Sequence, residues 1–81
     1  MWRIYFLELK KNDIYVGSTD DLRRRIADHN RGRVASTKPF IPPSLRSYVA
    51  VETELRARRL ERCFKPRSGK AFAKKRFLAA I

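Results

Sequence analysis

The sequence predicts a small α/β (α+β) fold, in which a three-stranded antiparallel sheet is flanked by helices in the order β-β-α-β-α-α. Three observations support this prediction. Two strand-like segments near the N-terminus flank a polar turn, an alternating segment follows later, and three further segments repeat apolar residues at helical intervals. The chain has 81 residues, 43% of them hydrophobic, which suffices for one small core. We therefore expect a single domain over residues 1–81.

The strands come first from a predicted β-hairpin. Trp2–Leu9 is rich in aromatic and β-branched residues, residues 10–13 (Lys-Lys-Asn-Asp) supply turn chemistry, and Ile14–Gly17 resumes the strand pattern. A third strand is expected over Leu45–Val51, where the two sets of side chains alternate along the segment.

The first helix is expected from about Asp20 to His29, because apolar residues recur there at helical intervals. Ser18 and Asp21 have the spacing of a capping box, and Thr19 and Asp20 are competing caps. Asn30 and Gly32 are placed to close the helix at its C-terminal end.

The second half of the chain begins with a long loop over residues 31–44, which holds three prolines and little periodicity. Thr53 then caps a second helix, and Pro66 ends it because proline has no amide hydrogen. A third helix begins at Ser68 or Gly69. The apolar residues expected in the core from these two helices are Ala57, Leu60, Phe64, Phe72, Phe77 and Leu78.

The charge of the chain indicates its partners. Twenty Lys and Arg residues against eight Asp and Glu give a formal net charge of +12, which favours a polyanionic partner. Nucleic acid is the first candidate, with anionic membrane surfaces and acidic proteins as alternatives that composition leaves open.

The N-terminal residues and the cysteine usage indicate the compartment. The apolar stretch at the N-terminus is interrupted by Glu8, Lys10 and Lys11, so it lacks the pattern of a signal peptide. No apolar run approaches the ~20 residues that span a bilayer. The single cysteine, Cys63, is expected to be a half-buried, reduced thiol. We expect a cytoplasmic protein that does not enter a membrane.

Hydrolysis of a phosphodiester bond needs an activated water, a cation beside the phosphate, and stabilisation of the leaving oxygen. Tyr5 and Tyr15 stand on the two strands of the predicted hairpin and can lie side by side in the sheet. Arg25 and His29 are four residues apart on the first helix, so they project from one side of it. Glu61 is isolated among basic residues, and a single carboxylate suffices for a hydrated Mg²⁺ ion.

A family resemblance joins these residues. Tyr5 in the first strand, the triplet Tyr15-Val16-Gly17 in the second, and then Asp21-Leu22 and Arg25 resemble the pattern of GIY-YIG nucleases. The likeness continues through residues 29–32 (His-Asn-Arg-Gly), 36–39 (Ser-Thr-Lys-Pro), Glu61 and 67–70 (Arg-Ser-Gly-Lys), so it spans nearly the whole chain.

The chain is most similar in pattern to short single-domain members related to the nuclease domain of the nucleotide-excision repair protein UvrC. It departs from the family pattern at two places. The first half-motif is Arg3-Ile4-Tyr5, so its glycine is replaced while its tyrosine is kept, and Pro66 directly follows the helix that carries Glu61.

The resemblance implies a metal-dependent DNA endonuclease that uses Mg²⁺ or Mn²⁺, with roles in DNA repair or recombination as the natural setting. It implies that Arg25 contacts the scissile phosphate, that His29 assists, and that Glu61 binds the metal. One tyrosine would be the general base for the attacking water and the other would position it. Sequence leaves the choice between them open, with a preference for Tyr5 as the base.

Each of these residues also has an ordinary structural interpretation. Arg25 is one of three consecutive arginines on a solvated face, and His29 is a helix C-terminal residue favoured by the helix dipole. Glu61 has the spacing of surface ion pairs with Lys65 and Arg58. Tyrosines in strands are usually packing residues. Gly17 is expected to meet a backbone requirement, an unusual dihedral angle or a close approach of the helix start and the phosphate.

The remaining basic residues point to DNA as the partner. Arg23, Arg24, Lys38 and Lys65 are interpreted as phosphate contacts or solvated charges. We expect a monomer that is selective for DNA structure or is recruited by a protein partner. The alternatives are a non-catalytic, basic nucleic-acid-binding module and a basic protein-interaction adaptor. Neither has an evident use for Glu61, which favours the nuclease.

Overall fold

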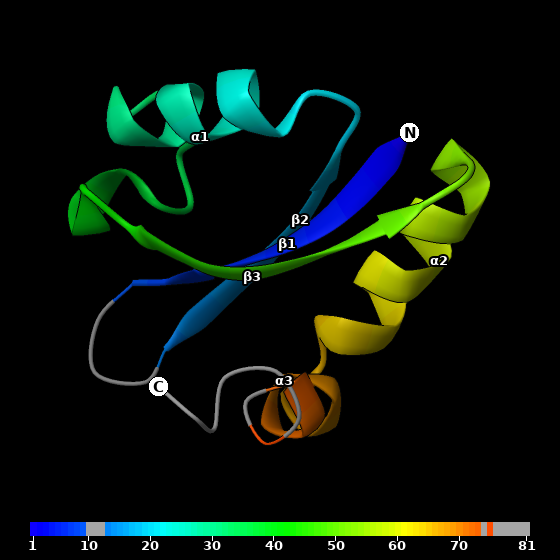
Figure 1. Cartoon of the computed structure of the whole chain (residues 1–81). Coiled ribbons are helices and arrows are strands. Elements are labelled where there is room, and N and C mark those ends of the chain that lie inside the picture. The colour runs from blue at the N-terminus through cyan, green and yellow to red at the C-terminus, as the bar shows by residue number, and fades with distance from the viewer. Residues whose placement is uncertain (10–12, 74, 76–81) are drawn as a thin grey trace.

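The computed structural model describes residues 1–9, 13–73 and 75. Figure 1 shows a three-stranded antiparallel sheet in the order β2-β1-β3, with α1 over one face and α2 and α3 over the other. The elements in chain order are β1 (Trp2–Glu8), β2 (Ile14–Thr19), α1 (Leu22–Asn30), the 3₁₀ turn η1 (Lys38–Phe40), β3 (Ser44–Val51), α2 (Glu54–Phe64) and α3 (Arg67–Ala73). The predicted fold class and element order are therefore confirmed.

The central strand β1 organises the sheet because it pairs with both other strands. It runs antiparallel to β2, with Tyr5 opposite Gly17, and antiparallel to β3, with Tyr5 opposite Tyr48. Four successive residues of β1 are completely buried: Ile4, Tyr5, Phe6 and Leu7. A strand with no exposed side chain in its middle must be covered on both faces, and helices provide that cover here (Figure 1).

The face of the sheet towards α2 and α3 carries the apolar core. Its buried residues are Ile4, Phe6, Ile14, Val16, Ala57 and Ala73, and Trp2, Val49, Val51, Leu60 and Phe64 pack against them. Phe6 and Phe64 meet edge to face, with ring centroids 5.3 Å apart. Full burial of a side chain such as Phe6 contributes on the order of 1.5–3 kcal/mol, so this face accounts for much of the stability.

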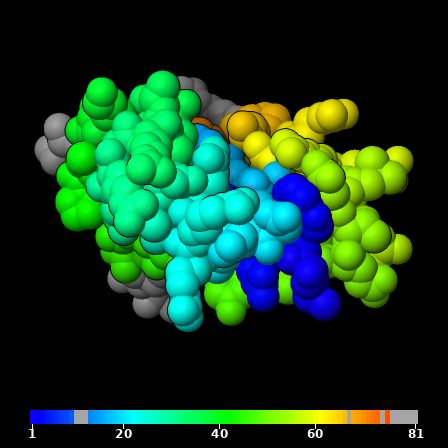
Figure 2. All heavy atoms as spheres, turned by 90° about the horizontal axis from the view of Figure 1, so that it is seen from above, coloured from blue at the N-terminus to red at the C-terminus, as the bar shows by residue number. Residues whose placement is uncertain are grey.

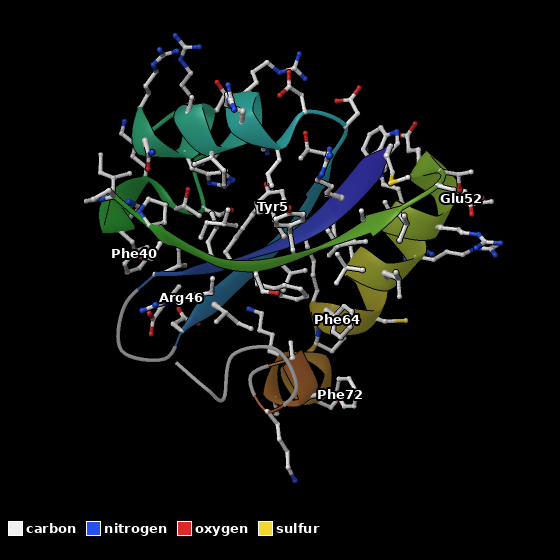
Figure 3. The ribbon with its side chains drawn as sticks, in the orientation of Figure 1. Tyr5, Phe40, Arg46, Glu52, Phe64 and Phe72 are labelled. Atoms are coloured by element: carbon white, nitrogen blue, oxygen red, sulfur yellow. The ribbon has the colours of Figure 1, made fainter. Side chains whose placement is uncertain are left out.

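The opposite face, under α1, buries polar groups as well. Tyr5, His29 and Thr37 are all completely buried there. Figure 3 shows Tyr5 between the sheet and α1, whereas Phe64 and Phe72 lie on the other side of the sheet near α3. The two faces of β1 therefore divide the molecule into an apolar core and a polar layer.

The start of α1 differs from the predicted capping box. The helix begins at Leu22, and the cap is Asp21, whose Oδ1 accepts a hydrogen bond from the backbone N–H of Arg24 at 3.1 Å. Ser18 is not a cap, because it lies within β2, one residue before the strand ends at Thr19. The C-terminal prediction is confirmed, since Gly32 follows the helix with φ of 73°, in the left-handed region that favours glycine.

The last two helices confirm some expectations and correct others. Thr53 caps α2, accepting from the backbone N–H of Arg56 at 3.2 Å, and α3 begins at Arg67, slightly earlier than predicted. Phe72 was expected in the core but is 50% exposed, and its ring stacks on Phe64 at the end of the molecule. Cys63 is exposed rather than half-buried, because α2 turns Ala57, Leu60 and Phe64 towards the sheet. Phe77 and Leu78 lie outside the described residues.

The long segment between α1 and β3 is more ordered than a plain loop. It contains turns and the 3₁₀ turn η1, and it buries Thr37 and Pro43. Seen from above in Figure 2, α1 and this segment form one side of the molecule, α2 forms the other, and parts of β1 and β2 lie between them. Among the described residues, no helix is long and apolar enough to cross a membrane.

Candidate active site

The hydroxyl group of Tyr5 is the centre of the polar layer. Its oxygen accepts a hydrogen bond from Nε of Arg25 at 3.2 Å and lies 2.9 Å from Nε2 of His29. Arg25 and His29 reach the same atom because they stand one helical turn apart on α1. The expectation that both project from one side of the helix is confirmed.

A chain of hydrogen bonds continues from His29 into the segment after α1. Nδ1 of His29 lies 2.7 Å from Oγ1 of Thr37, and Thr37 donates its hydroxyl hydrogen to the carbonyl of Val34 at 3.4 Å. With its hydrogen directed at Val34, Thr37 would accept from Nδ1–H, and Nε2 would then accept from Tyr5. In this assignment the chain runs Arg25 to Tyr5 to His29 to Thr37 to Val34, with each group donating to the next.

Gly17 makes room for the Tyr5 phenol. A Cβ atom at residue 17 would lie 2.4 Å from the Tyr5 hydroxyl oxygen and 2.5 Å from Cζ of the same ring. A close approach is present, and the group that approaches Gly17 within the protein is the Tyr5 phenol. Gly17 is not in the positive-φ region, so space and not an unusual dihedral angle selects glycine here.

Tyr15 joins the site from the edge strand β2 and is partly exposed. Its ring centroid lies 6.3 Å from that of Tyr5 and 5.1 Å from that of His29, and Nζ of Lys65 lies 5.8 Å from the Tyr15 ring centroid. Burial alone would lower the pKa of Arg25, but hydrogen bonds to the phenols of Tyr5 and Tyr15 raise it. Arg25 is therefore a permanent cation, bonded to Tyr5.

Glu61 reaches the site from α2, with a side chain only 17% exposed. One carboxylate oxygen accepts a hydrogen bond from Ser18, and the other lies 3.0 Å from Nζ of Lys65. Burial by itself would raise the pKa of Glu61, but these two contacts and the charges of Lys65 and Arg58 lower it below its ordinary value. Glu61 is thus ionised at neutral pH. Of its two expected ion pairs, the one with Lys65 forms, whereas Arg58 pairs with Glu54 instead.

Burial sets the protonation of Tyr5 and His29. It raises the pKa of Tyr5 to about 12, although the hydrogen bond from Arg25 acts in the opposite direction. Arg25 favours the phenolate, but burial outweighs its effect on the pKa of Tyr5. Burial and the charge of Arg25 together lower the pKa of His29, so its imidazole is neutral at neutral pH.

The carboxylate of Glu61 is the available ligand for a hard cation. Among the described residues, no group of three or more His, Cys, Asp and Glu side chains comes together. Mg²⁺ is commonly held by one or two carboxylates and completes its shell with water and phosphate oxygens, so an ionised, part-buried Glu61 fits it. Lys65 now holds one oxygen of that carboxylate and would have to release it.

Three of the four other basic residues predicted from sequence lie outside this cluster. Arg23 and Arg24 are exposed on α1, and Arg24 pairs with Asp20 at 3.5 Å. Lys38 is exposed in η1. Lys65 alone of the four contacts the site, through Glu61 and Tyr15.

Two residues of the site were missed by sequence reasoning. Thr37 had no assigned role, although it lies in the segment 36–39 that carries part of the family resemblance, because no local pattern indicates that its hydroxyl contacts a histidine eight positions away. Ser18 was interpreted as a helix cap, whereas it contacts Glu61 across 43 residues of sequence. Because side chains alternate along a strand, the place of Ser18 directly after Tyr15-Val16-Gly17 puts it on the same face as Val16, towards α2 rather than α1.

Comparison with known proteins agrees with this geometry. The GIY-YIG catalytic domain matches residues 1–76, so the chain belongs to the GIY-YIG family. Membership of this family implies nuclease-like hydrolysis of phosphodiester bonds. The chain is 37% identical over 65 residues to three streptococcal relatives, a match that covers 79% of this chain and 71% of each relative. They are UPF0213 proteins SpyM50708, M28_Spy1146 and SpyM3_1077 of Streptococcus pyogenes serotypes M5, M28 and M3. No solved structure gives a significant match.

Substitution of Gly17 by alanine should displace the Tyr5 phenol. We expect Gly17→Ala to destabilise the fold by about 1–3 kcal/mol, as overpacking of a buried site does. Chemical denaturation measures this cost, and Tyr5→Leu is the matched background. Without the phenol, the added methyl group has room, so the cost of Gly17→Ala should shrink there. An equal cost in both backgrounds would show that Gly17 serves another purpose.

The chain has one histidine, so NMR can observe His29 directly. We expect a neutral imidazole with the hydrogen on Nδ1, and a pKa below the ordinary value of 6.5. Thr37→Val should remove the Nδ1–H acceptor and change the ¹⁵N shifts towards a mixture of tautomers, while Thr37→Ser should preserve them. A wild-type protein with the hydrogen on Nε2 would contradict the assigned direction of the chain.

Proposed function

We propose that this protein is a metal-dependent endonuclease that hydrolyses phosphodiester bonds in DNA. The observation that supports it most is the assembly of five chemically matched side chains, Tyr5, Tyr15, Arg25, His29 and Glu61, contributed by β1, β2, α1 and α2. A structural role alone gives no reason to bury a phenol with an arginine, a neutral histidine and a nearby ionised carboxylate. Hydrolysis needs an activated water, a cation beside the phosphate and stabilisation of the leaving oxygen, and these groups can supply all three.

Arg25 is proposed to bind the scissile phosphate. It is a permanent cation, it is incompletely buried, and its guanidinium has further N–H donors besides the Nε–H that contacts Tyr5. Planar donors of this kind match phosphate oxygens and stabilise the charge that builds up during attack. When Arg25 turns to the phosphate, the Tyr5 oxygen loses one donor and is freed to accept from a water.

Tyr5 is proposed as the general base, acting together with His29. A free phenolate is disfavoured, because burial raises the pKa of Tyr5 to about 12. The hydrogen bond to His29 avoids this difficulty. As water attacks phosphorus, its hydrogen passes to the Tyr5 oxygen while the phenol hydrogen passes to Nε2 of His29. The imidazolium that forms keeps its Nδ1–H bond to Thr37, and Tyr15 positions the water.

Glu61 is proposed to hold Mg²⁺ or Mn²⁺. A bound ion would supply positive charge to the phosphate and to the leaving oxygen. The hydrogen bond from Ser18 keeps the Glu61 carboxylate turned towards the site. Because this carboxylate is ionised at neutral pH, it favours cation binding. Arg23, Arg24, Lys38 and Lys65 are proposed to contact the DNA backbone and to affect mainly affinity and its salt dependence.

The biological setting is part of the same proposal. A role in DNA repair or recombination, a cytoplasmic location, a single domain acting as a monomer, and recruitment by a protein partner all fit a small, strongly basic chain. The alternative is a non-catalytic DNA-binding module, which the net charge of +12 would also support.

Glu61→Gln separates the nuclease from the binding module. The substitution keeps the shape but removes the charge that would hold the metal, so we expect Mg²⁺-dependent cleavage to fall at least a hundredfold while DNA affinity is unchanged or slightly higher. The matched control is Glu54→Gln on the same helix, whose carboxylate pairs with exposed Arg58. Equal cleavage by Glu61→Gln and Glu54→Gln would refute the metal role.

The two phenols should differ in a second test. We expect Tyr5→Phe to lower the rate constant for cleavage of bound DNA by roughly a hundredfold or more, a typical contribution of general base catalysis. Tyr15→Phe should lower it less. A larger loss for Tyr15→Phe would assign the base to Tyr15 instead.

The pH dependence of cleavage tests the role of His29. Wild-type activity should persist below pH 6.5 and be lost as the pH falls through the lowered pKa of His29, because only neutral imidazole accepts the phenol hydrogen.

A further inference from the structure

A cleft opens directly beside the candidate active site. It has a volume of about 320 Å³ and lies between the hairpin, the segment after α1, and the junction of α2 with α3. Its lining residues are Leu9, Asp13, Ile14, Tyr15, Val16, Ser36, Phe40, Lys65 and Lys70. Tyr15 and Lys65 belong to the site as well, so whatever fills the cleft lies next to the reacting phosphate.

The walls of the cleft are chemically mixed in a specific way. Tyr15 and Phe40 contribute aromatic rings, and both are partly exposed. Figure 3 shows Phe40 at the side of the sheet where α1 ends. Lys65 and Lys70 add positive charge, while Asp13 and Ser36 add hydrogen-bonding groups. A flat, uncharged ring that hangs from a phosphodiester chain would satisfy all three kinds of group.

The size of the cleft narrows the choice further. Its volume is at the lower end of the about 300–1,000 Å³ typical of ligand sites, which suits one base with its sugar. A base that is still stacked and paired within a duplex cannot enter a cleft of this kind. A free inorganic anion would make no favourable contacts with the apolar and aromatic walls.

A second cleft of about 510 Å³ fits this ligand less well. It lies between the start of α1 and β3, and its residues are Arg3, Asp20, Asp21, Leu22, Arg23, Ile26, Leu45 and Tyr48. Its two carboxylates, Asp20 and Asp21, offset the charges of Arg3 and Arg23, so it offers a phosphodiester chain no net positive charge. It also shares no residue with the Tyr5 and Glu61 cluster. The exposed aromatic ring of Tyr48 makes it a useful comparison.

We propose that the cleft beside Tyr15 binds one unpaired nucleobase, that of the nucleotide next to the scissile phosphate, by stacking on Phe40. This inference rests on the proposed nuclease function and deepens it by naming the substrate class. DNA with an unpaired base at the cleavage position, such as a flap or a junction of single and double strands, is then bound and cut in preference to continuous duplex.

The test measures binding and cutting separately. Oligonucleotides with 2-aminopurine at the position next to the cleaved bond are prepared as a flap and as a continuous duplex of equal length. With EDTA present, we expect the wild-type protein to bind the flap about tenfold more tightly, the order of a single stacking interaction, and to quench 2-aminopurine fluorescence only in the flap. Cleavage with Mg²⁺ is then compared on the same two substrates.

Two substitutions change the cleft in opposite ways. Phe40→Ala removes the stacking ring, and Ser36→Phe at an exposed position fills the cleft. Both should abolish the tenfold preference and the quenching while duplex binding stays the same. Tyr48→Ala is the matched control, since it removes a partly exposed aromatic ring from the other cleft. Thermal unfolding followed by circular dichroism verifies that each variant is folded. If Phe40→Ala does not fold, Ser36→Phe alone tests the nucleobase site.

The outcomes separate this inference from the proposed function. Equal binding of flap and duplex, or loss of the preference in Tyr48→Ala but not in Ser36→Phe, would overturn the nucleobase site. If duplex and flap were cut equally fast, the nuclease proposal would stand and the nucleobase site would be rejected. If the flap were bound preferentially and no substrate were cut, the cleft would be supported and the proposed hydrolysis would fail.

Discussion

The hydrogen bonds of the buried Tyr5 hydroxyl are the constraint on which the rest of this structure depends. A buried hydroxyl without partners costs roughly 1–3 kcal/mol in proteins, so a phenol under α1 requires groups that satisfy it. Arg25 donates to its oxygen, and Nε2 of His29 lies 2.9 Å from the same atom. Thr37 then fixes the tautomer of His29, and Gly17 leaves the space in which the phenol lies. Each of these residues is explained by the one group they surround.

The two faces of the single strand β1 carry different kinds of side chain, apolar on one face and polar on the other. Ile4 and Phe6 of β1 point to the apolar core with α2 and α3, while Tyr5 points to the polar layer under α1. A network of buried polar groups is rigid when all its members are bonded, and in the described residues no buried side-chain polar atom lacks a hydrogen bond. The apolar face can therefore supply stability while the polar face positions chemistry.

Sequence reasoning predicted the fold well because its signals are local. The alternating and helical patterns of 81 residues, the cap Thr53, and the left-handed Gly32 all depend on near neighbours. Errors arose where tertiary packing decides. Nothing in the local sequence of Phe72 or Cys63 reveals that α2 and α3 turn them away from the sheet.

The candidate site shows the same limit. Arg25 and His29 were grouped from helical spacing, and Tyr5 and Tyr15 from the hairpin, because both relations are local. The contact of Ser18 with Glu61 and that of Thr37 with His29 join separate elements, so no spacing rule finds them. The raised pKa of Tyr5 was also beyond sequence, since the sign of the balance between burial and the charge of Arg25 needs coordinates.

The central claim is that these groups hydrolyse DNA with the help of a divalent cation. The measurement that tests it most directly is incubation of the purified wild-type protein with nicked, branched, single-stranded and duplex DNA, with Mg²⁺ or Mn²⁺ and, in parallel, with EDTA. The account predicts cleavage of at least one substrate with the metal and none with EDTA. Binding to these DNAs without metal-dependent cleavage of any of them would contradict it.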